Sequence, residues 1–360
     1  MKTIRQNVLA GLVLLAFAGA AHAAPAPQLT FTQLTQTTGC NAGGFSGSVY
    51  PSLSGVGGRM AFTSSCDLVP GGNPDQNVEL FVRNVSGGGL SQLTFSTGGV
   101  GTMHTSIDWF GARIVFASDR DLVPGQNADG NFEVFLIHAN GAGLTQLTHT
   151  TGGGDFPGCT YPAWDRMGDK IVFTSDRDLI PGGNTDGNHE IFVMNPNGSG
   201  VLQVTATTGA WGSGDASLNG NGSRALFSSD RDLVPGGNLD GNADLFAMDV
   251  YSGSVQQITH TTGGIGQVAP RWTANGKELT FRSDLDLVGE NPDGGFEVFR
   301  MNTTGTGLVQ VTTSASGSGF SAPWDIAANG DTMILHSDRD LVPGSNTDHN
   351  LEIYLAHLRP

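Results

Sequence analysis

The sequence is poor in charge, in cations and in cysteine. Only 14% of its residues are charged, and 17 lysines and arginines stand against 33 acids, which gives a formal net charge of −16. Nucleic-acid binding requires a basic surface that neutralises phosphate, so this balance argues against a nucleic-acid partner. It suits cationic partners or divalent metal ions instead. The three cysteines allow at most one internal disulfide.

Long apolar runs are absent from the sequence except near its start. There, Lys2 and Arg5 precede an apolar run over residues 8–21, and small residues follow up to Ala23. This pattern is typical of a secretory signal peptide, and the run is too short to span a bilayer comfortably. We therefore expect residues 1–23 to be cleaved off, leaving a periplasmic or secreted protein without a membrane anchor.

Helical periodicity is absent as well, whereas glycine is abundant, with 54 residues. A glycine directly before an apolar segment recurs at steps of 54 or 57 residues, at Gly57, Gly111, Gly168, Gly222, Gly276 and Gly330. Each step carries four short apolar segments, which is the signature of propeller blades. Residues 24–360 are therefore predicted to form one all-β domain, a six-bladed β-propeller with four-stranded blades. The repeats span roughly residues 50–99, 104–153, 161–210, 215–264, 269–317 and 322–358.

The two ends of the chain complement each other. The last repeat stops before its fourth strand, and the stretch "FTQLTQTTG" at residues 31–39 closely matches the fourth strand "LTQLTHTTG" at residues 144–152. We therefore expect residues 28–39 to supply the outer strand of the C-terminal blade. This closes the ring and pairs a strand edge that would otherwise be exposed.

The stretch "SDRDLIPGGNTDGNHEIF", residues 175–192, recurs in all six repeats. If strands A to D run outward from the axis, it connects strand B to strand C. Residues two apart at a strand end point the same way, so we expect Asp176 and Asp178 to converge while Arg177 points elsewhere.

Two interpretations of this loop stay open. Its carboxylate and amide oxygens are ligands that calcium prefers, and the candidate ligands are Asp119, Asp121, Asp129, Glu133, Asp176, Asp178, Asp186 and Glu190. The glycine of "NTDGN" comes fourth, however, and not sixth as in the helix-flanked calcium loop. Alternatively, the acids accept backbone N–H bonds and fasten a long turn. We favour the fastener, because a feature present in every blade indicates architecture.

In a propeller the D–A connections between blades lie on the same face as the B–C connections, so we expect a binding site on this face or in the adjoining mouth of the channel. His104 and Arg271 stand near the starts of inner strands, as Asp215 does, where the repeat is broken. Aromatic residues in or beside D–A connections complete the candidate binding residues, which are His104, Phe156, Trp211, Arg271 and Trp324. Trp164 and Trp272 align with aliphatic residues of the other repeats and are expected in the core.

The segments "YPAWDRMGDKIVFTSDRD" and "NHEIFVMNPNGSGVLQVT" resemble the repeat of TolB-type (WD40-like) propellers. They share a proline–aromatic start, an "SDRD" turn and a Thr ending, and the resemblance covers nearly the whole mature chain. The sequence differs by inserting "LVPGGNTD" into the turn, and it lacks room for the α/β domain that precedes the propeller in TolB. The resemblance implies a stand-alone propeller and, for the family, a role as periplasmic partner of an envelope lipoprotein.

Two classes of function follow. The first is a non-catalytic binding or scaffold module that holds a protein or glycan of the cell envelope on the loop face. The second is a periplasmic enzyme, a lyase or hydrolase, that works at the channel mouth with a metal held by carboxylates and a histidine. An enzyme should bring unmatched polar residues together on the axis, and His104, Asp215 and Arg271 form a small set. No Gly-x-Ser-x-Gly elbow occurs. We favour the binding module, with calcium as the only candidate cofactor.

The cysteines offer one further expectation. Cys40 lies in the connection that enters the first blade, and Cys66 replaces the usual arginine of the turn on the same face. We expect these two to form a disulfide, since disulfides persist in exported proteins. Cys159 would then remain a free thiol in a D–A connection.

Overall fold

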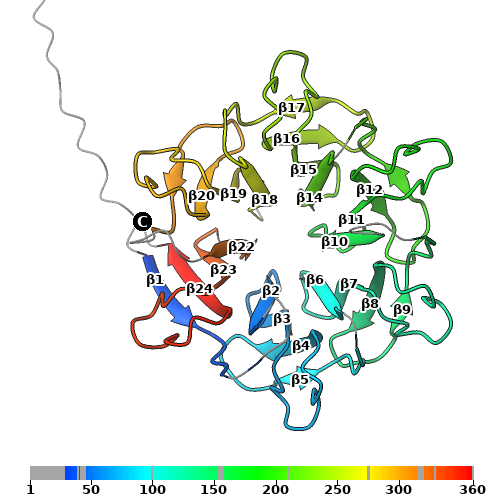
Figure 1. Cartoon of the computed structure of the whole chain (residues 1–360), viewed down its shortest axis with the longest axis vertical. Coiled ribbons are helices and arrows are strands. Elements are labelled where there is room, and N and C mark those ends of the chain that lie inside the picture. Colours follow the sequence, from blue (N-terminus) through cyan, green and yellow to red (C-terminus); the bar gives the residue numbers. More distant parts are fainter. Residues whose placement is uncertain are drawn as a thin grey trace, which may run out of the picture.

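The chain forms a ring of six antiparallel sheets with four strands each (Figure 1). The computed structural model describes residues 29–38, 40, 46–98, 100–152, 158–209, 211–273, 276–313, 320–327 and 330–358. The predicted six-bladed, all-β propeller is confirmed. Within the described residues, no helix has the length and apolar character needed to cross a membrane.

In each blade, strand A lies next to the axis and strand D at the outer edge. The first three blades comprise β2 (Ser48–Leu53), β3 (Arg59–Ser64), β4 (Glu79–Asn84) and β5 (Ser91–Gln92); β6 (Thr102–Ile107), β7 (Arg113–Ser118), β8 (Glu133–His138) and β9 (Thr145–Gln146); β10 (Cys159–Trp164), β11 (Ile171–Ser175), β12 (Glu190–Met194) and β13 (Leu202–Gln203). The last three comprise β14 (Ser213–Leu218), β15 (Arg224–Ser229), β16 (Asp244–Asp249) and β17 (Val255–Gln257); β18 (Gln267–Trp272), β19 (Glu278–Ser283), β20 (Glu297–Asn302) and β21 (Val309–Gln310); β22 (Ser321–Ile326), β23 (Thr332–Ser337), β24 (Glu352–Leu358) and β1 (Leu29–Gln33). Each strand A begins one or two residues before the predicted start of its repeat.

The core lies between neighbouring blades, because every sheet is covered on both faces. Strands B and C are accordingly apolar along most of their length and not alternating, as in "RIVFAS" of β7. In five blades a phenylalanine of strand B stacks on one of strand C, with Phe62 and Phe81 at 5.6 Å between ring centroids. Trp164 and Trp272 are each 8% exposed, which confirms their expected place in the core.

Strand β1 closes the ring. It pairs antiparallel with β24, in a register from Leu29 opposite Leu358 to Gln33 opposite Tyr354, and the two strands lie side by side in Figure 1. The chain stays attached beyond β1, because the Thr37 backbone N–H donates to Glu352 Oε1 at 2.5 Å. The predicted closing strand is therefore confirmed, and its regular part is shorter than residues 28–39.

The D–A and B–C connections meet on one face, which we call the loop face. A parallel bridge joins the residue before strand A to the residue before strand C of the preceding blade, as between Gly101 and Val78. A Cβ on Gly101 would lie 2.3 Å from the Val78 carbonyl oxygen, so only glycine permits this approach. Equivalent bridges occur at Gly47, Gly158, Gly212 and Gly266.

Two of the cysteines are joined and the third is buried. Cys40 and Cys66 form a disulfide with their Cα atoms 4.9 Å apart, which ties the connection into the first blade to that blade's B–C turn. Cys159 does not lie in a D–A connection as expected; that connection ends at Gly158, and Cys159 begins β10. Its burial raises the pKa of the thiol to about 12.

Deleting residues 28–38 should destabilise the ring strongly. The deletion leaves β24 with an unpaired edge, and each buried polar group that loses its partner costs about 1–3 kcal/mol. We expect the free energy of unfolding to fall by several kcal/mol, measured by urea denaturation. A chain that begins at Gln28 is the matched control and should keep the stability of the mature protein. Equal stability of the deletion and the control would contradict closure by β1.

Candidate functional site

The second aspartate of each B–C turn accepts hydrogen bonds from the turn's own backbone. Asp178 accepts from the N–H groups of Gly182 at 2.8 Å and of Gly183 and Asn184 at 3.0 Å. These bonds, from Asn184 and Gly182 first, hold the pKa of the carboxyl below its ordinary value. Asp121 binds its own turn in the same way.

The first aspartate binds a different segment, so the expected convergence of the pair is wrong. Asp119 accepts from the backbone N–H groups of Val100 and Gly101, in the D–A connection that enters its blade. Asp176 does the same with Gly158 at 2.9 Å. The intervening arginine also differs from expectation: the Arg177 Nε lies 3.2 Å from the Asp176 carboxylate. The paired acids thus secure two connections and do not share one ligand.

The remaining candidate calcium ligands are engaged as well. Glu133 accepts hydrogen bonds from the hydroxyls of Thr148 and Thr150, which follow the outer strand β9, and Glu190 from that of Thr207. Asp129 and Asp186 each accept one backbone N–H, from Gly152 and Gly209. Among the described residues, no three His, Cys, Asp or Glu side chains gather in a way that could hold a metal ion. These contacts support the fastener; calcium binding stays a prediction.

The inner strands contain a bulge that directs side chains toward the axis. In five blades the third residue of strand A has a positive φ beside a shift in the strand register, as at Tyr50 (51°), His104 (53°) and Asp215 (57°). Such bulges re-aim a side chain out of the regular pleat, and non-glycine residues in this conformation cluster at functional sites. In the last blade the equivalent residue is Pro323, which cannot take a positive φ, and the extra residue is Trp324.

Six rings meet at the loop-face end of the channel, and we call them the axial cluster: Tyr50, His104, Tyr161, Phe320, Trp324 and His336. His104 stacks on Tyr161 with ring centroids 3.7 Å apart. Burial, and then Arg271, lowers the pKa of His104 to about 3, so its imidazole is neutral at pH 7. Burial and Arg282 likewise lower the pKa of His336 to about 3.

Four charged residues lie around the cluster: Arg271, Arg282, Asp215 and Asp325. Arg271 is 9% exposed and donates to the backbone carbonyls of Trp324 and Asp215, at 3.0 and 3.1 Å. Asp325 accepts from Ser52 Oγ and the Leu53 N–H, both at 3.0 Å, and its burial raises the pKa of the carboxyl. The Arg282 guanidinium lies between the rings of Phe296 and Phe320, 5.0 and 4.9 Å from their centroids.

The structure thus places six polar residues together at the axis. Three of them, His104, Asp215 and Arg271, were identified from the sequence. The other three are Arg282, Asp325 and His336. Sequence reasoning missed these last three, although a signal was present. Arg282 and His336 occupy the second-last position of strand B, where the other blades carry small residues: Thr63, Ala117, Thr174 and Ser228.

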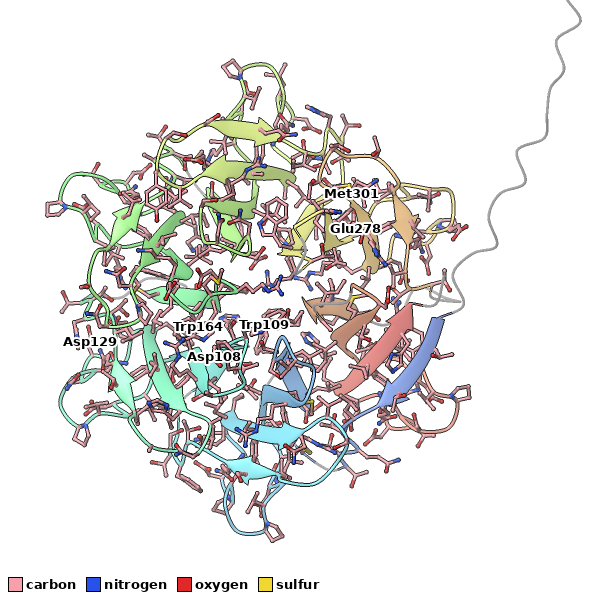
Figure 2. The ribbon with its side chains drawn as sticks, turned by 180° about the vertical axis from the view of Figure 1, so that it is seen from behind. Asp108, Trp109, Asp129, Trp164, Glu278 and Met301 are labelled. Carbon is pink, nitrogen blue, oxygen red and sulfur yellow. A yellow bond between two sulfur atoms is a disulfide. The ribbon has the colours of Figure 1, made fainter. Side chains whose placement is uncertain are left out.

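An axial cavity of about 110 Å³ continues the channel below the cluster. His104, Arg271 and Trp324 line its inner end, and Trp109 and Arg166 belong to the A–B turns at its outer end. Since strand A runs away from the loop face, the cavity lies toward the opposite face. Figure 2 shows Trp109 and Trp164 near the centre of the ring and Asp129 at its rim.

The other candidate binding residues have different positions. Trp211 lies in a D–A connection on the loop face and is 74% exposed. Trp324 was expected in or beside such a connection and free to stack on a ligand there, which is wrong: it is 6% exposed and belongs to β22 and the axial cluster. Phe156 lies outside the described residues.

Comparison with known proteins supports the fold alone. No protein-family model and no curated protein matches the chain. Similar solved structures include TolB from Acinetobacter baumannii (17% identity, 75% of this chain and 55% of that chain, TM-score 0.52) and a putative TolB from Agrobacterium tumefaciens (17%, 73% and 79%, TM-score 0.51). An oligogalacturonate lyase from Vibrio parahaemolyticus is 10% identical over 92% of this chain and 98% of its own, with a TM-score of 0.47. The chain thus has the fold of TolB-type propellers and spans about half of the Acinetobacter protein.

Replacing Asp178 with Asn tests the role of the B–C turn. The folded-state pKa of Asp178 lies below its ordinary value, so its stabilising effect is present above about pH 4 and lost as the pH falls further. We expect Asp178→Asn to lower the melting temperature by a few degrees at pH 7 and by less at pH 3. Asp286→Asn is the matched control, because Asp286 accepts a single backbone hydrogen bond and should matter less.

The same variant separates the fastener from calcium binding. If the turn is a fastener, Asp178→Asn loses the same stability in calcium and in chelator. If the turn holds calcium with a Kd of about 1 mM, as extracellular modules do, about 10 mM calcium should stabilise the wild type by roughly 1.4 kcal/mol per site. A calcium-dependent rise in melting temperature that Asp178→Asn reduces would contradict the fastener.

Proposed function

We propose that this chain is an exported, non-catalytic propeller that binds a protein of the cell envelope through its loop face. The observation that carries the proposal is a set of apolar side chains around the channel mouth. Val100, Trp211 and Ile265 occupy the same position in three D–A connections, directly before the bridging glycine, and are 45%, 74% and 58% exposed. We call them the mouth residues. Tryptophans in protein interfaces are often hot-spot residues, which contribute much of the binding free energy.

The mouth residues stand on a fixed backbone. Asp119 accepts the N–H of Val100 at 3.1 Å, and Asp284 accepts that of Ile265 at 2.8 Å. The Trp211 carbonyl accepts the N–H of His189 at 2.7 Å. A preorganised surface loses little conformational entropy on binding, so the fasteners of the B–C turns favour this face as an interface.

Charge favours a partner with a basic rim. The B–C turns surround the mouth, and each exposes one aspartate of its second half: Asp75, Asp129, Asp186, Asp240, Asp293 and Asp348. With a formal net charge of −16, the protein would attract a cationic partner at long range. An apolar centre with an acidic rim suits a protein better than a neutral glycan, which is the weaker alternative. The TolB resemblance supports the proposed envelope location.

The second candidate is an enzyme, a lyase or hydrolase with its site on the axis. The convergence of six unmatched polar residues on the axis favours it. Its weakness is proton transfer, because His104 and His336, with pKa values of about 3, are poor bases near neutral pH. We therefore place the binding module first.

If the protein is exported, its mature form should have a defined N-terminus. We expect intact mass spectrometry of the exported form to show a chain that begins at Ala24, because the signal pattern ends at Ala23. Peptide mapping without reductant should link Cys40 to Cys66 and leave Cys159 free, since Cys159 is buried. A protein that retains residues 1–23, or a peptide that links Cys159, would contradict this prediction.

Replacing Trp211 with Ser tests the loop face. We expect the wild-type protein to capture one cross-linked protein from an envelope extract at low salt, and Trp211→Ser to lose at least about 90% of that capture, as expected for a hot-spot residue. Capture should also weaken at high salt, because the exposed aspartates contribute to it.

Tyr251→Ser is the matched control for this experiment. Tyr251 is 68% exposed, close to the exposure of Trp211, but lies in a C–D turn on the opposite face. This variant should capture the same protein as the wild type. Equal capture by Trp211→Ser and Tyr251→Ser would exclude the mouth residues as the interface.

A further inference from the structure

Several residues that line the axial cavity carry buried polar atoms that lack partners. Neither ring nitrogen of His104, nor the indole N–H of Trp164 or Trp272, nor the hydroxyl of Ser217 has a hydrogen-bond partner among the described residues. These side chains are 5%, 8%, 8% and 6% exposed, and all four residues line the cavity. Buried polar groups are almost always hydrogen-bonded, and several unpaired ones around a single cavity point to a polar ligand.

Arg271 adds a buried charge to this lining. Its Nε and Nη1 donate to backbone carbonyls, and its Nη2 has no partner in the part of the chain that the structure describes. Neither nearby carboxylate forms an ion pair with it. Asp325 is engaged with Ser52 and Leu53, and Asp215 accepts the backbone N–H of Ala269. A buried guanidinium with a free nitrogen is suited to an anion, above all a carboxylate.

Hydrogen-bond donors predominate among these groups. Arg271 Nη2 and the two indoles can only donate, and the neutral His104 ring donates from one nitrogen and accepts at the other. The main unpaired acceptor of the lining is Asp165 Oδ2, in the A–B turn of the third blade. An anionic group therefore satisfies more of these atoms than a cation would.

The size of the cavity limits the ligand. A cavity of about 150 Å³ accommodates benzene, so about 110 Å³ holds a group of roughly four or five non-hydrogen atoms and not a whole sugar ring. At the outer end, the Trp109 ring lies under the Arg166 guanidinium, 3.9 Å from it. This pair offers an apolar and cationic wall to the part of a ligand that extends from the cavity.

We propose that the axial cavity binds the carboxylate head group of a small organic acid, with Arg271 as the principal anion-binding residue. His104, Ser217 and the indoles of Trp164 and Trp272 supply further hydrogen bonds. This site is separate from the proposed loop-face interface, because it lies on the opposite side of the axial cluster. An experiment can therefore contradict one proposal without contradicting the other.

The tryptophans provide a selective signal for this site. The chain has five, and four of them line the cavity: Trp109, Trp164, Trp272 and Trp324. The fifth, Trp211, is exposed on the loop face. In a Trp211→Phe background, the fluorescence of the full mature chain therefore comes from the cavity alone.

Titration with acetate at constant ionic strength tests the proposal. We expect a saturable fluorescence change with a millimolar Kd, and no saturable change with acetamide, which has the size and shape of acetate but carries no charge. Inorganic phosphate should bind at least about tenfold more weakly than acetate, because its five non-hydrogen atoms in a tetrahedral arrangement reach the upper limit of the cavity, whereas acetate has four. No saturation with acetate, an equal response to acetamide, or phosphate binding as tight as acetate would overturn the carboxylate site.

Two arginine variants identify the binding group. Arg271→Met should weaken acetate binding at least about tenfold, as loss of a hydrogen bond to a charged group does. Arg282→Met is the matched control, because Arg282 is also axial but does not line the cavity, and its Kd should stay within about twofold. If Arg271→Met does not fold, Ser217→Ala replaces it, with an expected weakening of about threefold. Unchanged affinity in the folded member of this pair would overturn the assignment.

Discussion

The structure depends on one junction that occurs between successive blades. At five junctions a glycine before strand A forms a bridge to the residue before strand C of the preceding blade, and at four of these an acid at the end of strand B accepts N–H groups of the same connection. Because the glycine has no Cβ, the two backbones can approach, and because the carboxylate accepts the remaining donors, the connection needs no regular structure of its own. Many of the acids of the chain thus serve as internal hydrogen-bond acceptors.

In this arrangement, the residues that recur in every blade and the residues that differ between blades occupy separate positions. The phenylalanine pairs and the fasteners recur because each blade must pack against two neighbours with the same geometry. The third residue of strand A points out of the regular pleat toward the axis, so it can differ from blade to blade. Two tyrosines, a histidine, an aspartate and an alanine share one backbone conformation there: Tyr50, Tyr161, His104, Asp215 and Ala269. Unlike residues can therefore meet on the axis without disturbing the contacts between blades.

The same separation explains how much the sequence could predict. The period, the strand count and the closing strand follow from recurring residues, and so do the core positions of Trp164 and Trp272. The axial residues were harder to predict, because they can be identified only where they differ from the repeat. Arg282 and His336 stand in strand B where the other blades carry small residues, and this difference alone does not reveal that they lie against Phe320 and Trp324. Trp324 was misplaced because Pro323 excludes a positive φ, so the extra residue of the strand is one position later.

The axial cluster also divides the molecule into two surfaces. On the loop-face side, the channel ends in stacked rings surrounded by exposed apolar side chains; on the other side, it widens into a cavity with unpaired donors. Trp324 and His104 belong to both, because they are part of the ring stack and of the cavity lining. A ligand that contacts Arg271 therefore lies against the rings that close the channel beneath the loop face. Any influence of such a ligand on protein binding would have to pass through the packing of these two side chains, since the surrounding blades are held by their own fasteners.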